Sequence, residues 1–248
     1  MEFGRELILG ILSAAVIAIA AAVWRWKLAS LLIAYARSFQ LAARLKGLGL
    51  HQVYGSRADY AKYRRATRLI DYLSLAKGRI IVSGYWLAQG AEMEGVLDGL
   101  EKLIKNNSQL HVDIVVMDPA AEYVDSVALS MDLSRQAVVG RVNETLLALR
   151  RLYERIPESE CHRLRAGLHT SQPIFSIIAL DPESKSGRIQ VDIKPFGVPR
   201  SRSISFELRG LESILYLTMW ESCRKLIDRA LPFDRSIEFD PMHPNSGS

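Results

Sequence analysis

The chain has 248 residues and a formal net charge of +5, with 49% apolar and 24% charged residues. These proportions supply enough apolar side chains for one sizeable core of about 200 residues. The two cysteines, Cys161 and Cys223, have no CxxC spacing, which argues against a disulfide-stapled secreted domain and against a metal or redox site.

An uncharged segment of eighteen residues, Leu7 to Trp24, dominates the N-terminal part of the sequence. As a helix it would extend roughly 27 Å, close to the ~30 Å hydrocarbon thickness of a bilayer. We therefore expect a transmembrane anchor over residues 1–27. A secretory signal peptide and a buried core helix are the two alternatives to this prediction.

Basic residues are concentrated after this segment. Residues 25–68 contain ten Lys or Arg and one Asp, a net charge of +9, and the first six of these basic residues precede any acidic one. Because Lys and Arg beside a spanning helix tend to stay on the cytoplasmic side, we expect a single-pass inner-membrane protein with a cytoplasmic C-terminal domain. The same charge favours membrane lipids as partners and does not require nucleic acid.

Residues 28–55 are predicted to form a juxtamembrane amphipathic helix followed by a linker. An apolar stripe that includes Leu28, Leu32, Tyr35 and Phe39 would form one side of this helix. The stripe could continue the spanning helix into the cytoplasm as a stalk, lie in the membrane interface, or pair with its copy in a second chain. We expect a dimerising stalk and thus a homodimer.

Residues 56–232 are predicted to form one α/β domain, and residues 233–248 a tail. Its first part alternates helices and short apolar strands, a pattern typical of a parallel sheet with crossover helices. The predicted helices are 57–76, 92–105, most of 121–155 and 211–229, and the predicted strands are 79–83, 111–117, 162–168, 173–180, 188–194 and 203–208.

Two stretches of this domain resemble the phospholipase D-like superfamily. Leu69 to Asp118 has the order of helices and strands that opens the family's unit, and Leu164 to Val191 resembles its strand pair, in which a His-x-Lys-x4-Asp motif leads into a turn. The resemblance covers one unit, residues 57–230. It implies a sheet flanked by helices, and pairing with a second copy as in other single-unit members.

The motif of that family is degenerate in this chain. If Asp181 takes the aspartate position, the lysine position falls on Ser176 and the histidine position on Ile174. If His169 takes the histidine position, the other two positions fall on Ser171 and Ser176. The family reaction needs an imidazole nucleophile and a lysine that neutralises phosphate charge. The resemblance therefore implies the fold and argues against the usual activity.

His169 is the strongest candidate for acid–base chemistry, because it follows a predicted strand end where loops carry function in open α/β sheets. Asp118 ends another predicted strand and could hold a ligand hydroxyl or a metal, or cap the next helix. The histidine spacings give no zinc site, and the glycine spacings give no dinucleotide or P-loop site. We therefore expect neither metal nor cofactor.

Lys194, Arg200, Arg202 and Ser203 surround a Pro-Phe-Gly-Val-Pro loop. Cationic and hydroxyl-bearing side chains of this kind bind phosphate through charge-assisted hydrogen bonds. With Asp118, they are the predicted ligand-binding residues for an anionic small molecule, a nucleotide or a phospholipid headgroup.

The sequence thus favours a membrane-anchored binding, sensor or effector domain with an inactive phospholipase D-like fold. Two alternatives stay open. The first is a divergent phosphodiesterase or phospholipase that uses His169, and the second is a structural oligomerisation scaffold at the membrane.

Overall fold

The computed structural model describes residues 35, 37, 38, 40–55, 59, 69–87, 91–173, 175–193, 197, 198 and 202–233. The chain divides into two compact units, Met1–Gly47 and Leu48–Ser248. In the first unit, residues 40–47 are helical. All the elements below belong to the second unit.

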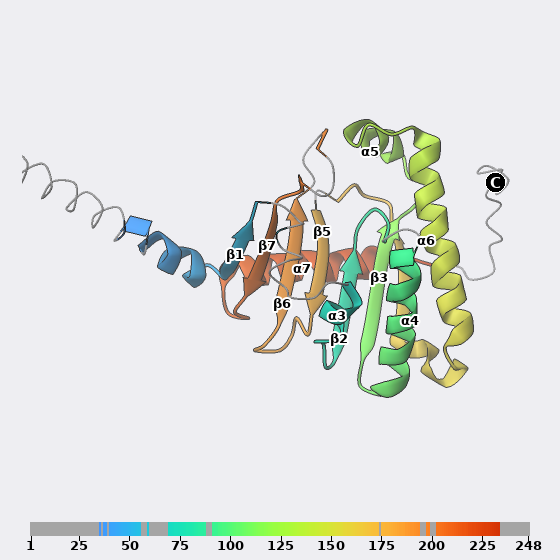
Figure 1. Cartoon of the computed structure of the whole chain (residues 1–248), viewed down its shortest axis with the longest axis horizontal. Coiled ribbons are helices and arrows are strands. Elements are labelled where there is room, and N and C mark those ends of the chain that lie inside the picture. Colours follow the sequence, from blue (N-terminus) through green and yellow to red (C-terminus); the bar gives the residue numbers. More distant parts are fainter. Residues whose placement is uncertain are drawn as a thin grey trace, which may run out of the picture. The chain divides into compact units, whose positions relative to one another are not determined.

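One mixed sheet runs through the second unit, with eight strands among the described residues in the order β1-β7-β6-β5-β2-β3-β4-β8 (Figure 1). Strands β2, β3 and β4 are parallel, whereas every other neighbouring pair is antiparallel. The strands are β1 (Leu50–Tyr54), β2 (Arg79–Ser83), β3 (His111–Met117), β4 (Leu164–His169), β5 (Phe175–Leu180), β6 (Arg188–Ile193), β7 (Ser205–Arg209) and β8 (Leu231–Pro232).

Helices cover both faces of the sheet, and each face has its own apolar cluster (Figure 1). Side chains alternate along a strand, so Ile80 and Val82 face one cluster and Ile81 the other. The first cluster packs against α3 (Leu69–Leu73), α4 (Ala91–Asn106), α5 (Val124–Ser130) and α6 (Arg135–Arg155), and the second against α7 (Ile214–Arg229). A 3-10 helix, η1 (Glu158–Arg163), leads into β4.

The α/β part of the predicted fold class is confirmed, and its transmembrane part is corrected. Among the described residues, no helix combines the length and the apolar character needed to cross a bilayer. The described helices are amphipathic, with one apolar face toward the sheet and charged residues on the other, whereas a spanning helix needs about 20 apolar residues all round. The segment that suggested a membrane span, residues 7–24, lies outside the described residues.

The predicted strands are present, but the sheet is only partly parallel. Strands β5, β6 and β7 follow one another as an antiparallel meander, because the turn of residues 181–187 is too short for a crossover. The predicted helix of 121–155 is divided into α5 and α6, and the Ser134 hydroxyl caps α6 by accepting the Ala137 N–H at 3.1 Å. Strand β1 was not predicted.

Candidate functional site

The three parallel strands end at one edge of the sheet, which we call the carboxyl edge. Ser83, Met117 and His169 are the last residues of β2, β3 and β4. Strand β6 runs in the same direction, so the loop after Ile193 also leaves from this edge. Sheet topology therefore places the loops that carry the predicted site residues at one edge, where open α/β sheets commonly bind ligands.

His169 is almost completely buried, with 2% of its surface exposed, and protein groups contact both ring nitrogens. Nε2 lies 3.0 Å from the Gly84 carbonyl oxygen, and Nδ1 lies 2.6 Å from the Tyr123 hydroxyl and 3.1 Å from the Ser171 carbonyl oxygen. The Tyr123 hydroxyl, which has one proton, also lies 3.0 Å from the His169 carbonyl oxygen, so it donates either to that oxygen or to Nδ1.

Tyr123 supports this arrangement in two ways. Its ring stacks on the imidazole at a centroid distance of 5.9 Å and an angle of 10°. Burial, and then the neighbouring Tyr85 and Asp118, raise the pKa of Tyr123, so its hydroxyl stays protonated and available as a donor. The ring of His169 thus contacts protein groups at both nitrogens and stacks on the Tyr123 ring.

Asp118 and His169 are brought together through the backbone. The Asp118 N–H donates to the His169 carbonyl oxygen at 3.1 Å, next to the paired strands β3 and β4. A carboxylate oxygen of Asp118 accepts the Ala120 N–H at 2.8 Å. This side chain therefore closes the turn after β3 and does not cap the next helix, α5, whose N-cap residue is Tyr123.

Two of the predicted cations, Lys194 and Arg200, lie outside the described residues. Arg202 is exposed, and Ser203 is buried just before β7. Strands β5, β2 and β3 lie between β6 and β4. Of the predicted ligand-binding residues that the structure describes, only Asp118 is thus adjacent to His169.

A cavity of about 280 Å³ lies beside His169, between the carboxyl edge and α7, and we call it the His169 cavity. Leu226 of α7 and Ile177 of β5 contribute apolar walls. Among the described residues that line it, none is acidic. Its polar lining consists of the hydroxyls of Ser83, Thr170, Ser171 and Ser222, the Gln172 amide, His169, and the cations Lys225 and Arg229.

Ser83 has an unsatisfied hydroxyl in this cavity lining. The residue is 3% exposed, and its Oγ is buried without a hydrogen-bond partner in the structure. A buried hydroxyl without a partner costs about 1–3 kcal/mol, so such groups are rare in folded proteins. An acceptor or donor brought by a ligand would remove this cost.

The two cations of the His169 cavity come from the C-terminal part of α7 and differ in their partners. The Lys225 ammonium lies 2.7 Å from a carboxylate oxygen of Glu221 on the surface, and this hydrogen bond lowers the pKa of Glu221. The Arg229 guanidinium makes no ion pair with any described residue. Arg229 is therefore available to an anion without breaking an existing salt bridge.

Sequence reasoning missed Ser83, Lys225 and Arg229. The spacing of Lys225 and Arg229 at i and i+4 on a predicted helix was visible, but it usually marks a solvated helix face. Ser83 ends an apolar strand and gave no separate signal. The packing of α7 across the sheet brings the three residues to one cavity.

No protein-family model matches the chain, and no curated protein matches it. Among solved structures, similarity is found to TrmBL2, an archaeal chromatin protein that binds DNA (TM-score 0.40, 9% identity, 84% of this chain and 66% of that one). Similarity is also found to Nuc, a phospholipase D family member from Salmonella typhimurium (TM-score 0.41, 12% identity, 73% of this chain and 95% of that one). A third similar structure is phosphatidylserine synthase from Haemophilus influenzae Rd KW20 (TM-score 0.47, 12% identity, 77% of this chain and 40% of that one).

The solved structures similar to this chain thus include a phospholipase D family member, the family that the sequence resembles. The degenerate motif is not tested by that likeness. Because the identities are 9–12% and the TM-scores 0.40–0.47, the function is inferred below from the geometry of this chain alone.

Proposed function

We propose that the domain is a binding module for a small phosphate-bearing ligand, held in the His169 cavity. The observation that carries the proposal is the composition of this cavity, which combines two cations and four hydroxyls with no described carboxylate. Anions are favoured where cationic side chains and hydroxyl donors converge without acidic neighbours.

The cavity suits one phosphate group with a small organic substituent. Its volume of about 280 Å³ is at the lower end of the ~300–1,000 Å³ typical of ligand sites. Arg229 would contact the phosphate through two parallel hydrogen bonds, and Lys225 would act as a point charge. The buried Ser83 hydroxyl would gain the partner that it lacks.

His169 has a positioning role in this proposal. Its contacts with Gly84 and Ser171 connect the end of β2 to the loop that contributes Thr170 and Ser171 to the cavity. An imidazole with protein groups at both nitrogens must give up one of these contacts before it can hydrogen-bond a substrate. This supports binding over the phosphodiesterase alternative.

The proposal is tested by calorimetric titration of the protein with inorganic phosphate, glycerol 3-phosphate and adenosine monophosphate, which separates headgroup-like from nucleotide-like ligands. Arg229→Ala should weaken binding about 10- to 100-fold, since a hydrogen bond to a charged group contributes about 1.5–3 kcal/mol. The matched control is Arg224→Ala, on the same helix and outside the cavity lining. Equal effects of the two substitutions, or no binding of any of these ligands, would contradict the proposal.

The enzyme alternative has its own test. Release of nitrophenol from bis-nitrophenyl phosphate should be at background level for the wild type and for His169→Ala alike. Turnover by the wild type that His169→Ala abolishes would favour the phosphodiesterase.

A further inference from the structure

A second and larger cavity lies at the opposite edge of the sheet. This amino-edge cavity, of about 810 Å³, is formed where β2, β3 and β4 begin and where the turn after β5 folds back. None of its lining residues belongs to the His169 cavity. Its charges differ as well, because here cations and carboxylates occur together.

The three carboxylates that line the amino-edge cavity already have partners. Asp181 accepts the backbone N–H groups of residues 77, 78 and 79 at 2.7–2.8 Å. Asp113 and Glu183 both pair with the Arg79 guanidinium, at 2.9 and 3.2 Å. Their negative charge is thus largely compensated within the protein.

Two further arginines line this cavity and are partly engaged. Arg163 is buried, donates to the Asn107 carbonyl oxygen at 2.6 Å and pairs with Glu160. Arg165 is exposed, and one of its nitrogens donates to the Ile227 carbonyl oxygen at 2.8 Å. The charge of Arg163 is thus compensated by Glu160, whereas Arg165 pairs with no carboxylate of the described residues.

Three other side chains in the lining are uncommitted. The Lys77 ammonium and the imidazoles of His111 and His162 make no hydrogen bond or ion pair with any described residue. They come from three segments, namely the turn before β2, the start of β3 and η1. The β3–β4 register pairs Val112 with Leu164. The start of β3, with His111, therefore lies beside the end of η1, with His162.

We propose that the amino-edge cavity binds a compact polyanion of the polyphosphate class. Four permanent cations, Lys77, Arg79, Arg163 and Arg165, line it together with three carboxylates, Asp113, Asp181 and Glu183. Arg79 and Arg163 pair with carboxylates, whereas Lys77 and Arg165 make no ion pair with any described residue. These two cations are available to phosphate oxygens, and the imidazoles of His111 and His162 can donate further hydrogen bonds.

The volume and the hydroxyls agree with this ligand class. About 810 Å³ accommodates several linked phosphates, within the ~300–1,000 Å³ range of ligand sites. Ser184 and Ser186, from the turn after β5, bond to each other at 3.1 Å and can each turn a hydroxyl toward phosphate oxygen.

The test is calorimetric titration of the full chain with sodium triphosphate, repeated with adenosine triphosphate. Lys77→Ala should weaken binding about tenfold, whereas Lys185→Ala should not, because Lys185 is an exposed lysine next to the lining residues but outside the cavity. Similar affinities for the two ligands indicate recognition of phosphates alone, and tighter adenosine triphosphate binding indicates a nucleotide.

The double variant His111→Asn/His162→Asn should weaken triphosphate binding and keep the melting temperature of the wild type, since both imidazoles are exposed and uncommitted. Arg229→Ala should leave triphosphate binding unchanged, which separates this site from the His169 cavity. The proposal is overturned by unchanged binding in the double variant, by equal effects of Lys77→Ala and Lys185→Ala, or by loss of binding in Arg229→Ala. Binding of an oligonucleotide in the absence of triphosphate binding would also overturn it.

Discussion

The carboxylate of Asp181 connects the turn after β5 to the start of β2. The residue has a left-handed φ of +47° and follows directly after β5. Its two oxygens accept the N–H groups of Lys77, Gly78 and Arg79, which begin β2. Asp181 thus has a clear structural role in this chain.

Asp181→Asn should lower the free energy of unfolding by about 2–4 kcal/mol, because the amide presents an NH₂ group to backbone donors while still tolerating a positive φ. Urea denaturation measures the change. Glu183→Gln is the control, since Glu183 is 65% exposed in the same turn and pairs with one arginine. Equal losses in the two variants would show that the three backbone contacts contribute little.

Cys223 makes the free energy of unfolding depend on pH in the alkaline range. Burial raises the pKa of its thiol from 9.0 to about 12, and the positive charge of Arg79 opposes part of this rise. The unfolded chain loses the thiol proton first as the pH rises, so the free energy of unfolding should fall from about pH 9 upward. Tyr216, whose pKa burial also raises, acts in the same direction.

The denaturation midpoint should therefore be lower at about pH 10.5 than at about pH 8, and this difference should be smaller in Cys223→Ala than in the wild type. At neutral pH, alkylation of the native protein should modify Cys161, which is partly exposed, and spare Cys223. Rapid alkylation of Cys223 in the native state would contradict its burial.

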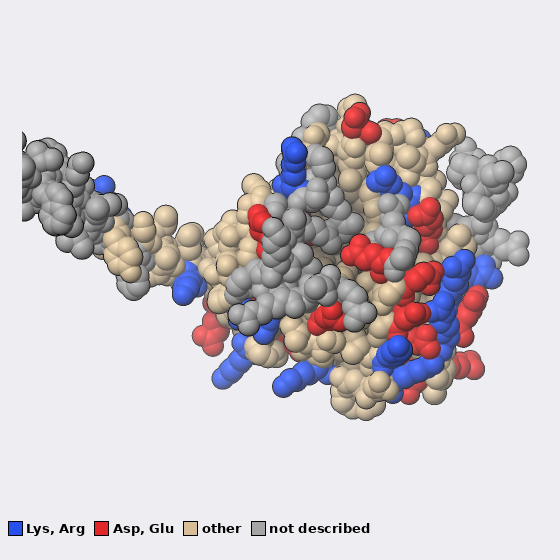
Figure 2. Space-filling model, viewed as in Figure 1, with Lys and Arg blue, Asp and Glu red and all other residues tan. Residues whose placement is uncertain are grey.

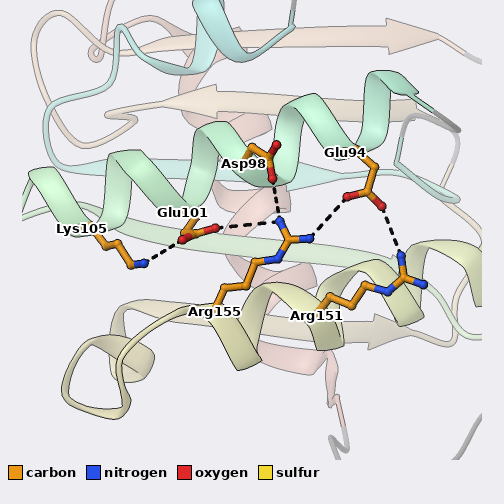
Figure 3. A network of polar contacts seen from close by, with 6 residues as sticks. All are labelled: Glu94, Asp98, Glu101, Lys105, Arg151 and Arg155. Atoms are coloured by element: carbon orange, nitrogen blue, oxygen red, sulfur yellow. Dashed lines mark hydrogen bonds and ion pairs between the residues drawn. The ribbon is translucent and has the colours of Figure 1, made fainter.

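Helices α4 and α6 are joined on the surface by a network of ion pairs (Figure 3). Arg155 reaches Asp98 at 2.6 Å and lies within 4 Å of Glu94 and Glu101, and Arg151 contacts Glu94 at 3.3 Å. Figure 2 shows acidic and basic side chains intermingled on this side of the molecule, as expected for a balanced network. The apolar faces of the two helices, buried against the sheet, supply most of the attachment.

Arg155→Ala should lower the free energy of unfolding by about 0.5–1 kcal/mol at low ionic strength, because it removes the central cation of a partly exposed network. The loss should shrink in about 1 M NaCl, where charges are screened beyond ~3 Å. Arg150→Ala is the control on the same helix, since Arg150 pairs only with Glu154 among the described residues. A salt-independent loss would indicate packing rather than charge.

At the scale of elements, the apolar runs of β2, β3 and β5 and the 3.6-residue spacing in α4, α6 and α7 were sufficient to predict these segments. Strand β1 (LHQVY) escaped prediction because it is short, half polar and at the sheet edge, where one side needs no apolar partner. The direction of β5, β6 and β7 depends on short turns, which a pattern of helices and strands does not reveal.

The second unit contains a complete core of its own. Both apolar clusters are built from residues between Leu50 and Phe233, and the Leu48 carbonyl oxygen accepts the Leu215 N–H at 3.2 Å at the base of α7. Residues 48–248 should therefore melt within about 2 °C of the full chain, whereas residues 56–248 should melt several degrees lower, because loss of β1 exposes the edge of β7. Circular dichroism melts of the three proteins test this, and aggregation of residues 48–248 would contradict it.

The homodimer expected from the sequence stays a prediction. The dimer contact could lie in the stripe of residues 28–46 or in the α/β unit. Light scattering on the full chain and on residues 48–248 distinguishes the two, since a dimer held by the stripe should dissociate in the shorter protein. A dimer that persists there would instead involve the α/β unit.

The sequence by itself determined most helices and strands, though not β1 or β8, because local periodicity and turn residues act over a few positions. It also placed His169 and Asp118 each at a strand end, and the structure shows that these strands, β4 and β3, are neighbours. Only the tertiary structure decided that His169 is locked by Tyr123 and that Ser83 and Arg229 share its cavity. Their convergence depends on how α7 crosses the sheet, a relation between distant segments that no local pattern encodes.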